Sequence, residues 1–249
     1  MIDEVDAPPP ALNSGFALFL DFDGTLVEIA DTPESIRVPP RLFTLLNRLF
    51  DRLSGRVAII SGRSIQDLER HLGCSSLALS GSHGLELRLP GGEDVPVAAP
   101  EWLEDARRQI AEFAAGHGLI VEEKPASIAV HFRQAPDRER NVTDFLDMLA
   151  RSRGLTVQHG RMVAELRPTG ADKGDALRRL MAEPLFASAR PLFVGDDLTD
   201  EDGFAAAAAM GGGGILVGPR RATAARWRLD DVPAVLRWLE QGKSEHRNG

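Results

Sequence analysis

Three short apolar runs, each followed by small polar or acidic residues, constrain the fold of this chain most: residues 17–20 (ALFL), 57–60 (VAII) and 191–194 (PLFV). Uninterrupted apolar runs of this length are typical of strands that are buried on both faces of a sheet. Segments with helical spacing separate them, as at residues 39–53, where leucines recur on one helix face. Alternation of strands and helices favours parallel strand pairing, so the sequence predicts an α/β fold.

The same patterns predict the elements at both ends of the chain. Strands are expected at residues 17–21, 57–60, 77–79, 191–195 and 215–217, and helices at residues 39–53, 64–72, 173–182, 200–209 and 232–239. The four consecutive glycines at 211–214 are expected to form a flexible turn, since no strand–GxGxxG–helix pattern surrounds them.

The middle of the chain has a different texture, in which two helical segments are interspersed with short strands that read as hairpins. The helices are expected at residues 101–115 and 137–150, and the strands at residues 85–89, 119–123, 128–133, 155–158 and 162–166. This pattern predicts an α+β domain with an antiparallel sheet, inserted at residues 83–167 into a core made of residues 16–82 and 168–249. The acidic, proline-rich residues 1–15 are expected to be a disordered lead.

Composition narrows the functional classes. The chain has 249 residues and a net charge of −8, which disfavours nucleic acid and anionic membranes as partners. The single cysteine, Cys74, excludes an internal disulfide framework and indicates a reducing compartment. The N-terminus lacks the pattern of a signal peptide, and no apolar run reaches the ~20 residues of a membrane span. We therefore expect a cytoplasmic protein.

Acidic residues follow two of the predicted strands. Asp21 and Asp23 precede Gly24, and Asp196 and Asp200 follow the strand at 191–195. Ligands of open α/β sheets bind at the carboxyl ends of strands, and gathered carboxylates are costly to bury unless they are paired or bind a metal. Mg²⁺, which prefers oxygen ligands, would resolve this repulsion. A solvated Asp-Gly turn and a helix cap are the simpler alternatives.

Two further segments offer groups that suit a phosphate. Ser61, Gly62 and Arg63 follow the strand at 57–60, where a hydroxyl and a backbone N–H can hold a phosphate oxygen. Lys173 opens a predicted helix, and a cation there does not favour the helix dipole, so a role in neutralising an anion explains it better. An ordinary turn serine is the alternative for Ser61.

The order DxDGT, Ser, Lys and GDDxxD resembles the four motifs of the haloacid dehalogenase (HAD) superfamily of phosphotransferases. This resemblance implies a Rossmann-like HAD core and a phosphatase in which Asp21 is the nucleophile and Asp23 the general acid/base. It also implies that Ser61 and Lys173 bind the transferring phosphoryl group. In the phosphatase version of the DxDGT motif, the residue at the position of Thr25 helps to orient the general acid/base, so Thr25 is expected to help orient Asp23.

The resemblance further implies a Mg²⁺ site. Asp21, Asp196 and the backbone carbonyl of Asp23 are expected to bind the ion, and Asp200 to support it, through water or directly.

The middle segment extends the likeness. It lies where HAD enzymes carry a C2-type cap that sets substrate specificity, and its motifs are GSHGLE at residues 81–86, EEK at 122–124, HFR at 131–133 and ELRP at 165–168. With these motifs, residues 16–240 resemble the trehalose-6-phosphate phosphatase family in its bacterial single-domain form. The implied substrate is trehalose 6-phosphate, and the implied partner in function is a trehalose-6-phosphate synthase. The candidate substrate-binding residues are Gly62, Arg63, His83, Gly84, Glu122, Lys124, His131, Arg133 and Glu165.

Simpler interpretations compete in the cap. Glu123 could replace Glu122, His131 and Arg133 could be the polar face of a strand, and Glu165 could pair with Arg167. For the whole chain the alternatives are a phosphatase of sucrose phosphate, mannosylglycerate phosphate or another sugar phosphate, a catalytically silent sugar-phosphate-binding module, and a phosphomutase.

Overall fold

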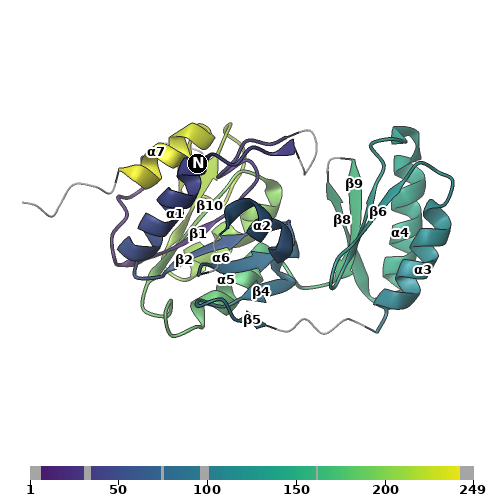
Figure 1. Cartoon of the computed structure of the whole chain (residues 1–249), viewed down its shortest axis with the longest axis horizontal. Helices are drawn as coiled ribbons and strands as arrows, with labels where there is room; N and C mark the ends of the chain where they lie inside the picture. The colour runs from purple at the N-terminus through teal and green to yellow at the C-terminus, as the bar shows by residue number, and fades with distance from the viewer. Residues whose placement is uncertain (1–6, 31–34, 74–75, 96–100, 161, 242–249) are drawn as a thin grey trace, which may run out of the picture. The chain divides into compact units, whose positions relative to one another are not determined.

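The computed structural model describes residues 7–30, 35–73, 76–95, 101–160 and 162–241 (Figure 1). The chain divides into a core unit, Met1–Val95 with Asp172–Gly249, and an inserted unit, Pro96–Ala171. Cys74 lies outside the described residues. No helix of the described ranges combines the length and the apolar character that crossing a membrane would require.

The core unit contains an eight-stranded sheet in the order β12-β11-β10-β1-β2-β3-β4-β5. Its strands are β1 (Phe16–Leu20), β2 (Val57–Ile60), β3 (Ala78–Gly81), β4 (Glu86–Arg88), β5 (Asp94–Val95), β10 (Arg190–Gly195), β11 (Gly213–Val217) and β12 (Trp227–Leu229). Every pair from β12 to β3 is parallel, while β4 and β5 are antiparallel additions at one edge. The predicted α/β fold with a parallel sheet is confirmed.

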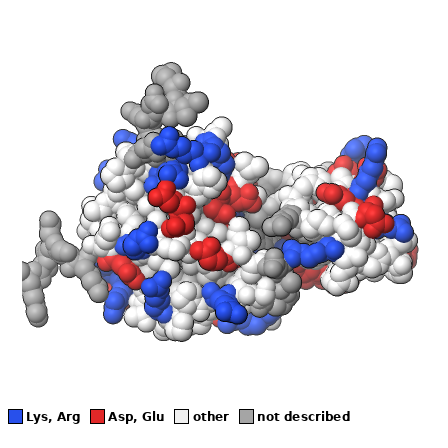
Figure 2. Space-filling model, turned by 90° about the horizontal axis from the view of Figure 1, so that it is seen from above, with Lys and Arg blue, Asp and Glu red and all other residues white. Residues whose placement is uncertain are grey.

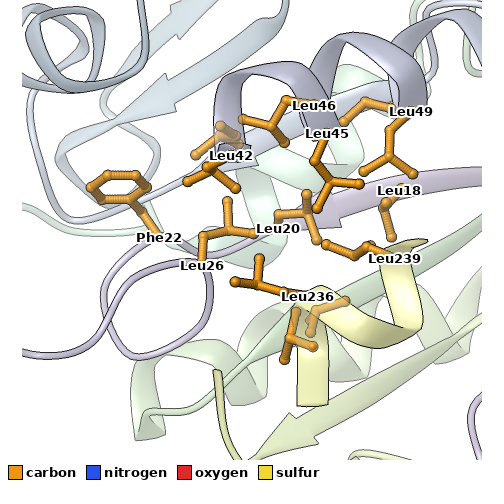
Figure 3. Close-up of a cluster of buried hydrophobic side chains, with 14 of the residues drawn as sticks. Leu18, Leu20, Phe22, Leu26, Leu42, Leu45, Leu46, Leu49, Leu236 and Leu239 are labelled. Carbon is orange, nitrogen blue, oxygen red and sulfur yellow. The ribbon is translucent and has the colours of Figure 1, made fainter. Parts of the chain in front are cut away.

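Helices cover both faces of this sheet because its strands are apolar on both sides. Leu18 and Leu20 of β1 pack with leucines of α1 and α7 (Figure 3). Phe19, between them, points to the opposite face, where it packs with residues of α5 and α6. The helices are α1 (Pro40–Arg52), α2 (Ile65–Leu72), α5 (Lys173–Met181), α6 (Glu201–Ala209) and α7 (Val232–Glu240), with short 3-10 turns at Ser82–Gly84 and Leu198–Asp200.

The glycine run departs from the expected flexible turn. Gly213 and Gly214 begin β11 and are buried. A Cβ on Gly214 would lie 2.5 Å from the ring of Phe204, and one on Gly213 would lie 2.8 Å from the ring of Trp227. These glycines therefore let aromatic side chains pack directly against the strand, and only the front of the run remains a turn.

The N-terminal lead also differs from the expectation of disorder. Residues 1–6 lie outside the described residues, but within residues 7–15 Pro9 and Pro10 are half-buried and Leu12 is buried. Leu12 is buried in the apolar cluster around α7, and the carbonyl of Pro10 accepts a hydrogen bond of 3.1 Å from the indole N–H of Trp238. Burial of Leu12 in the core thus holds this segment in place, although its composition is acidic and proline-rich.

The inserted unit is an antiparallel sheet in the order β6-β7-β9-β8, with two helices on one of its faces (Figure 1). Its elements are β6 (Ile120–Glu123), β7 (Ile128–His131), β8 (Leu155–Gly160), β9 (Val163–Pro168), α3 (Leu103–Ala114) and α4 (Glu139–Arg153), with a 3-10 turn at Pro136–Arg138. The expected hairpin at residues 155–166 is present as β8 and β9.

The start of the inserted unit differs from the predicted boundary. The change in the hydrophobic pattern along the sequence predicts an insertion at residues 83–167, whereas in the structure the residues up to Val95 belong to the core unit. The reason is strand pairing, since β4 pairs with β3 and β5 pairs with β4 to extend the large sheet.

Candidate active site

The candidate site lies where the order of the parallel strands reverses. From β1 the chain proceeds to β2 and β3 on one side, and the later strands β10, β11 and β12 follow on the other. Ligands of open α/β sheets bind at the carboxyl ends of the strands that flank such a point. The N–H of Asp21 donates a 2.9 Å hydrogen bond to the carbonyl of Val194, so the loops after β1 and β10 start side by side.

Three carboxylates gather at this position. Asp21, Asp196 and Asp200 each present an oxygen, and these oxygens all lie within 4.8 Å of one another. Asp21 is 4% exposed and Asp200 is 0% exposed. A solvated turn does not bury its carboxylates in this way, so the turn interpretation of the first acidic segment is wrong.

Lys173 supplies the positive charge of the cluster. Its Nζ donates to Asp21 Oδ1 at 2.7 Å and to Asp200 Oδ1 at 2.6 Å. It is the first residue of α5, which Asp172 caps by accepting a hydrogen bond from the N–H of Asp175 at 2.7 Å. Burial alone would lower the pKa of Lys173, but the two carboxylates outweigh burial and raise it. Lys173 therefore remains charged.

One ammonium group does not neutralise three carboxylates. Burial raises the pKa of Asp21 well above its usual range, and repulsion from Asp200 and Asp196 adds to this effect, while Lys173 opposes it. Burial, followed by repulsion from Asp200, raises the pKa of Asp196 to about 7. The site is thus short of positive charge, which a bound cation would supply.

The donors fit a hard divalent cation such as Mg²⁺. All three groups of the cluster offer carboxylate oxygens, the ligand type that Mg²⁺ prefers. Asp196 Oδ1 is buried and has no hydrogen-bond partner among the described residues, as expected of an atom that is reserved for an ion. The side chain of Asp23, by contrast, is not part of this cluster.

Two glycines allow the acidic groups to approach the backbone. Gly24 has φ of +80°, and a Cβ there would lie 2.2 Å from Asp196 Oδ2. A Cβ on Gly195 would lie 2.2 Å from Cγ of Asp200. The glycine of the DxDGT segment is therefore required both for the left-handed turn and for the space that Asp196 occupies.

Asp23 is held by Arg63. Arg63 Nε donates to Asp23 Oδ2 at 2.6 Å, and Nη2 donates to Oδ1 at 2.8 Å. Thr25, which was expected to orient Asp23, is fully buried, and its Oγ1 has no hydrogen-bond partner in the described part of the chain. The contact that orients Asp23 in the structure is therefore the one from Arg63. Arg63 lies too far from Asp23 in the sequence for a local motif to predict this contact.

The other predicted phosphate-side residues cluster after β2 and β3. Ser61 is buried, its Oγ accepts a 3.2 Å hydrogen bond from the N–H of Arg63, and its carbonyl accepts one of 2.9 Å from the N–H of His83. A Cβ on Gly62 would lie 2.5 Å from His83 Nε2. At Gly84, where φ is +101°, a Cβ would lie 2.6 Å from the carbonyl of Asp172. Both glycines permit close contacts within the core unit.

Four of the five candidate residues in the inserted unit form two pairs. Lys124 and Glu165 are buried, and their ion pair has an Nζ–Oε2 distance of 3.0 Å. His131 Nε2 lies 2.9 Å from Glu122 Oε2. Arg133 lies exposed in the turn after β7, which ends at His131 rather than continuing through residue 133.

These pairs lie on the sheet face opposite the helices. Ile128, Val130 and Leu166 pack with α3 and α4, so the alternate residues His131 and Glu165 point to the other face. Sequence reasoning missed Ser127, whose hydroxyl donates to Glu165 Oε1 at 2.6 Å.

Arg221 is a second residue that sequence reasoning missed. Four arginines lie within residues 220–228, a pattern that is typical of a solvated surface. Instead, Arg221 Nη2 donates to the carbonyl of Asp197 at 2.8 Å and to that of Asp196 at 3.4 Å, and Nη1 pairs with Glu201. Arg221 lies in the loop directly after β11, at the same sheet edge as the acidic residues, and this position could have marked it as a residue near the site.

Comparison with known proteins identifies the family of the chain. The family model described as trehalose-phosphatase matches residues 19–233. A trehalose-6-phosphate phosphatase of Escherichia coli is 36% identical over 234 residues, covering 93% of this chain and 88% of that protein. A probable trehalose-phosphate phosphatase of Sinorhizobium fredii is 36% identical over 207 residues, covering 82% of this chain and 78% of the relative.

A solved structure gives the same result for the fold. The C-terminal domain of the Candida albicans trehalose-6-phosphate phosphatase superposes with a TM-score of 0.76 at 26% identity, covering 94% of this chain and 98% of that domain.

Proposed function

The chain belongs to the trehalose-phosphatase family of HAD-type phosphomonoesterases, and from this premise we propose that it hydrolyses trehalose 6-phosphate to trehalose and phosphate through an aspartyl phosphate on Asp21. The observation that carries the proposal is the buried cluster in which Lys173 lies 2.7 Å from Asp21 and two further carboxylates adjoin. A nucleophilic carboxylate must meet a phosphate dianion, so its site needs positive charge.

The residues of the core unit would divide the work of the first step. Asp21 attacks phosphorus in line with the leaving oxygen, while Ser61 and Lys173 hold the transferring phosphoryl group. Asp23 donates a proton to the leaving sugar oxygen and then removes one from the water that hydrolyses the intermediate.

Asp21, Asp196 and Asp200 would hold Mg²⁺, together with the backbone carbonyl of Asp23. The ion would reduce the repulsion between the nucleophile and the phosphate oxygens. Two observations support this assignment: no described residue forms a hydrogen bond with Asp196 Oδ1, and the pKa of Asp196 is raised.

The inserted unit would recognise the sugar. Trehalose offers many hydroxyl groups, and a surface that pairs carboxylates with cationic donors can bind them. Support comes from the pairs Lys124–Glu165 and Glu122–His131 on one face of its sheet. Arg133, together with His83, Gly84, Gly62 and Arg63 of the core unit, completes the proposed substrate-binding set.

The proposal includes the setting of the reaction. Hydrolysis of trehalose 6-phosphate would be the last step of trehalose synthesis, coupled in function to the synthase that supplies the substrate. The cytoplasmic location that the single cysteine indicates is consistent with this.

The test is release of phosphate from a panel of sugar phosphates with Mg²⁺, using the wild type, Asp21→Asn and the exposed-site control Asp230→Asn. We expect clear preference for trehalose 6-phosphate, loss of activity in Asp21→Asn, and unchanged activity in the control. Equal rates on all sugar phosphates would defeat the substrate assignment, and an active Asp21→Asn would defeat the mechanism.

A further inference from the structure

We infer that Arg63 is a positioning residue for Asp23, which fixes the orientation of the carboxyl group that transfers the proton. The inference deepens the proposed function and rests on it. Arg63 contacts Asp23 through two N–H groups, at 2.6 and 2.8 Å, so both carboxyl oxygens are engaged and rotation of the group is restricted.

Arg63 is itself fixed from a second side. Its Nη1 donates to Asp67 Oδ2 at 2.6 Å, and its guanidinium carbon lies 5.6 Å from the centre of the Phe22 ring. Asp67 belongs to the first turn of α2, which Ser64 caps by accepting a 3.1 Å hydrogen bond from the N–H of Asp67. The Arg63 side chain is only 10% exposed. The orientation of Asp23 is therefore transmitted from a helix.

Electrostatics supports a persistent contact. Burial would lower the pKa of Arg63, yet hydrogen bonds and attraction from Asp23 and Asp67 raise it, so the guanidinium remains charged. The planar guanidinium matches the geometry of a carboxylate in a way that a lysine ammonium does not.

The chemical consequence concerns the leaving group. As Asp21 forms its bond to phosphorus, the bond from phosphorus to the leaving oxygen breaks, and that oxygen takes the proton of the Asp23 carboxyl group. This transfer leaves Asp23 as the carboxylate whose two oxygens accept from Arg63. A poor leaving group needs this proton, whereas a good leaving group departs without it. Loss of Arg63 should therefore lower kcat/KM more for substrates whose leaving oxygen is more basic.

The test is a series of aryl phosphates of similar shape, from 4-nitrophenyl to phenyl phosphate, measured as kcat/KM with wild type, Arg63→Gln and Arg63→Lys. In Arg63→Gln we expect about a 10- to 100-fold loss on phenyl phosphate and less than about a 3-fold loss on 4-nitrophenyl phosphate. Arg63→Lys should lie between, since a lysine keeps the charge but not the two-point contact. The double variant Arg63→Gln, Asp23→Asn should have the same kcat/KM on phenyl phosphate as Asp23→Asn alone.

The matched control is Arg70→Gln. Arg70 contacts the same Asp67 at 3.4 Å but is 66% exposed, so its removal changes the local charge without touching Asp23. We expect its kcat/KM slope against leaving-group basicity to equal that of the wild type, and thermal melting checks that all variants fold. An equal loss on every aryl phosphate, or no loss, would overturn the inference, because it would mean that Arg63 binds only the phosphoryl group or does not act through Asp23.

The same series separates this inference from the proposed function. Asp21→Asn should abolish hydrolysis of the aryl phosphates if the nucleophile is correct. A wild type that ignores trehalose 6-phosphate but hydrolyses aryl phosphates through Asp21 would defeat the sugar assignment alone.

Discussion

The buried charges of the proposed active site show how single residues constrain one another. Asp21, Lys173 and Asp200 are between 0% and 4% exposed, and the ammonium of Lys173 lies between the two carboxylates. Breaking a buried ion pair by removing one partner leaves an uncompensated charge, which costs far more than the pair contributes. Lys173 is therefore expected to affect both folding and chemistry.

Replacing Lys173 by methionine tests this dual role. With a metal chelator present, we expect the free energy of unfolding to fall by roughly 3–5 kcal/mol, because Asp21 and Asp200 lose their partner. Phosphatase activity with Mg²⁺ should fall by about 10²- to 10³-fold or more. Urea unfolding and phosphate release measure the two effects, and Arg178→Met, on the exposed side of the same helix, should change stability by no more than about 0.5 kcal/mol. Unchanged stability in Lys173→Met would contradict the pairing.

At the scale of elements, the loop after β10 depends on the loop after β11. Arg221 donates to two carbonyls of the first loop and pairs with Glu201 at the start of α6. Glu201 also accepts hydrogen bonds from Thr223 Oγ1 at 3.1 Å and from the N–H of Ala224 at 2.7 Å. This network connects the backbone next to Asp196 to the loop after β11, so it should hold Asp196, a proposed metal ligand, in place.

Arg221→Gln is therefore expected to weaken binding of a divalent metal by about 10-fold. Displacement of Mn²⁺, followed by electron paramagnetic resonance, measures this affinity without relying on turnover. The control is Arg228→Gln, which removes an arginine that contacts Gly218 and Asp230 instead. Equal affinities in both variants would show that the loop keeps its shape without Arg221.

At the scale of the whole molecule, the location of charge matters more than its sum. The chain carries a net charge of −8, yet acidic and basic side chains are interspersed over the face that Figure 2 shows. The unbalanced negative charge that matters lies inside the core unit, where burial raises the pKa of Asp196 from its ordinary 3.8 to about 7. Global stability should thus depend on pH and on metal together.

The sign of this dependence follows from proton linkage. Because the folded protein binds a proton on Asp196 more tightly than the unfolded chain, metal-free stability should fall as the pH rises from about 4 to about 7. Mg²⁺ would take the place of that proton, so it should raise Tm more at about pH 8 than at about pH 6. Thermal melting with Mg²⁺ or chelator measures both effects, and Asp196→Asn should reduce them. A Mg²⁺ effect that is larger at the lower pH would contradict this account.

Local patterns predicted much of the site because its motifs sit on regular elements. Asp21 and Asp196 could be placed together because both follow buried strands, and parallel strands present their carboxyl ends at one edge. Lys173 could be assigned to an anion because a cation at a helix N-terminus does not stabilise the helix. Contacts between residues that are far apart in the sequence could not be predicted from such local patterns. Asp23 meets Arg63 across 40 positions, and Lys124 meets Glu165 across 41.

Sequence patterns alone predicted the alternation of strands and helices, the antiparallel character of the inserted segment and the acids at the strand ends, because periodicity and strand-end chemistry are local properties. The tertiary structure decided the rest. It placed Arg63 rather than Thr25 on Asp23, turned part of the glycine run into a strand beneath Phe204, and brought Arg221 to the loop of Asp196. The physical reason is that each of these depends on which side chain fills the space beside a given backbone, and that is settled only when distant elements pack.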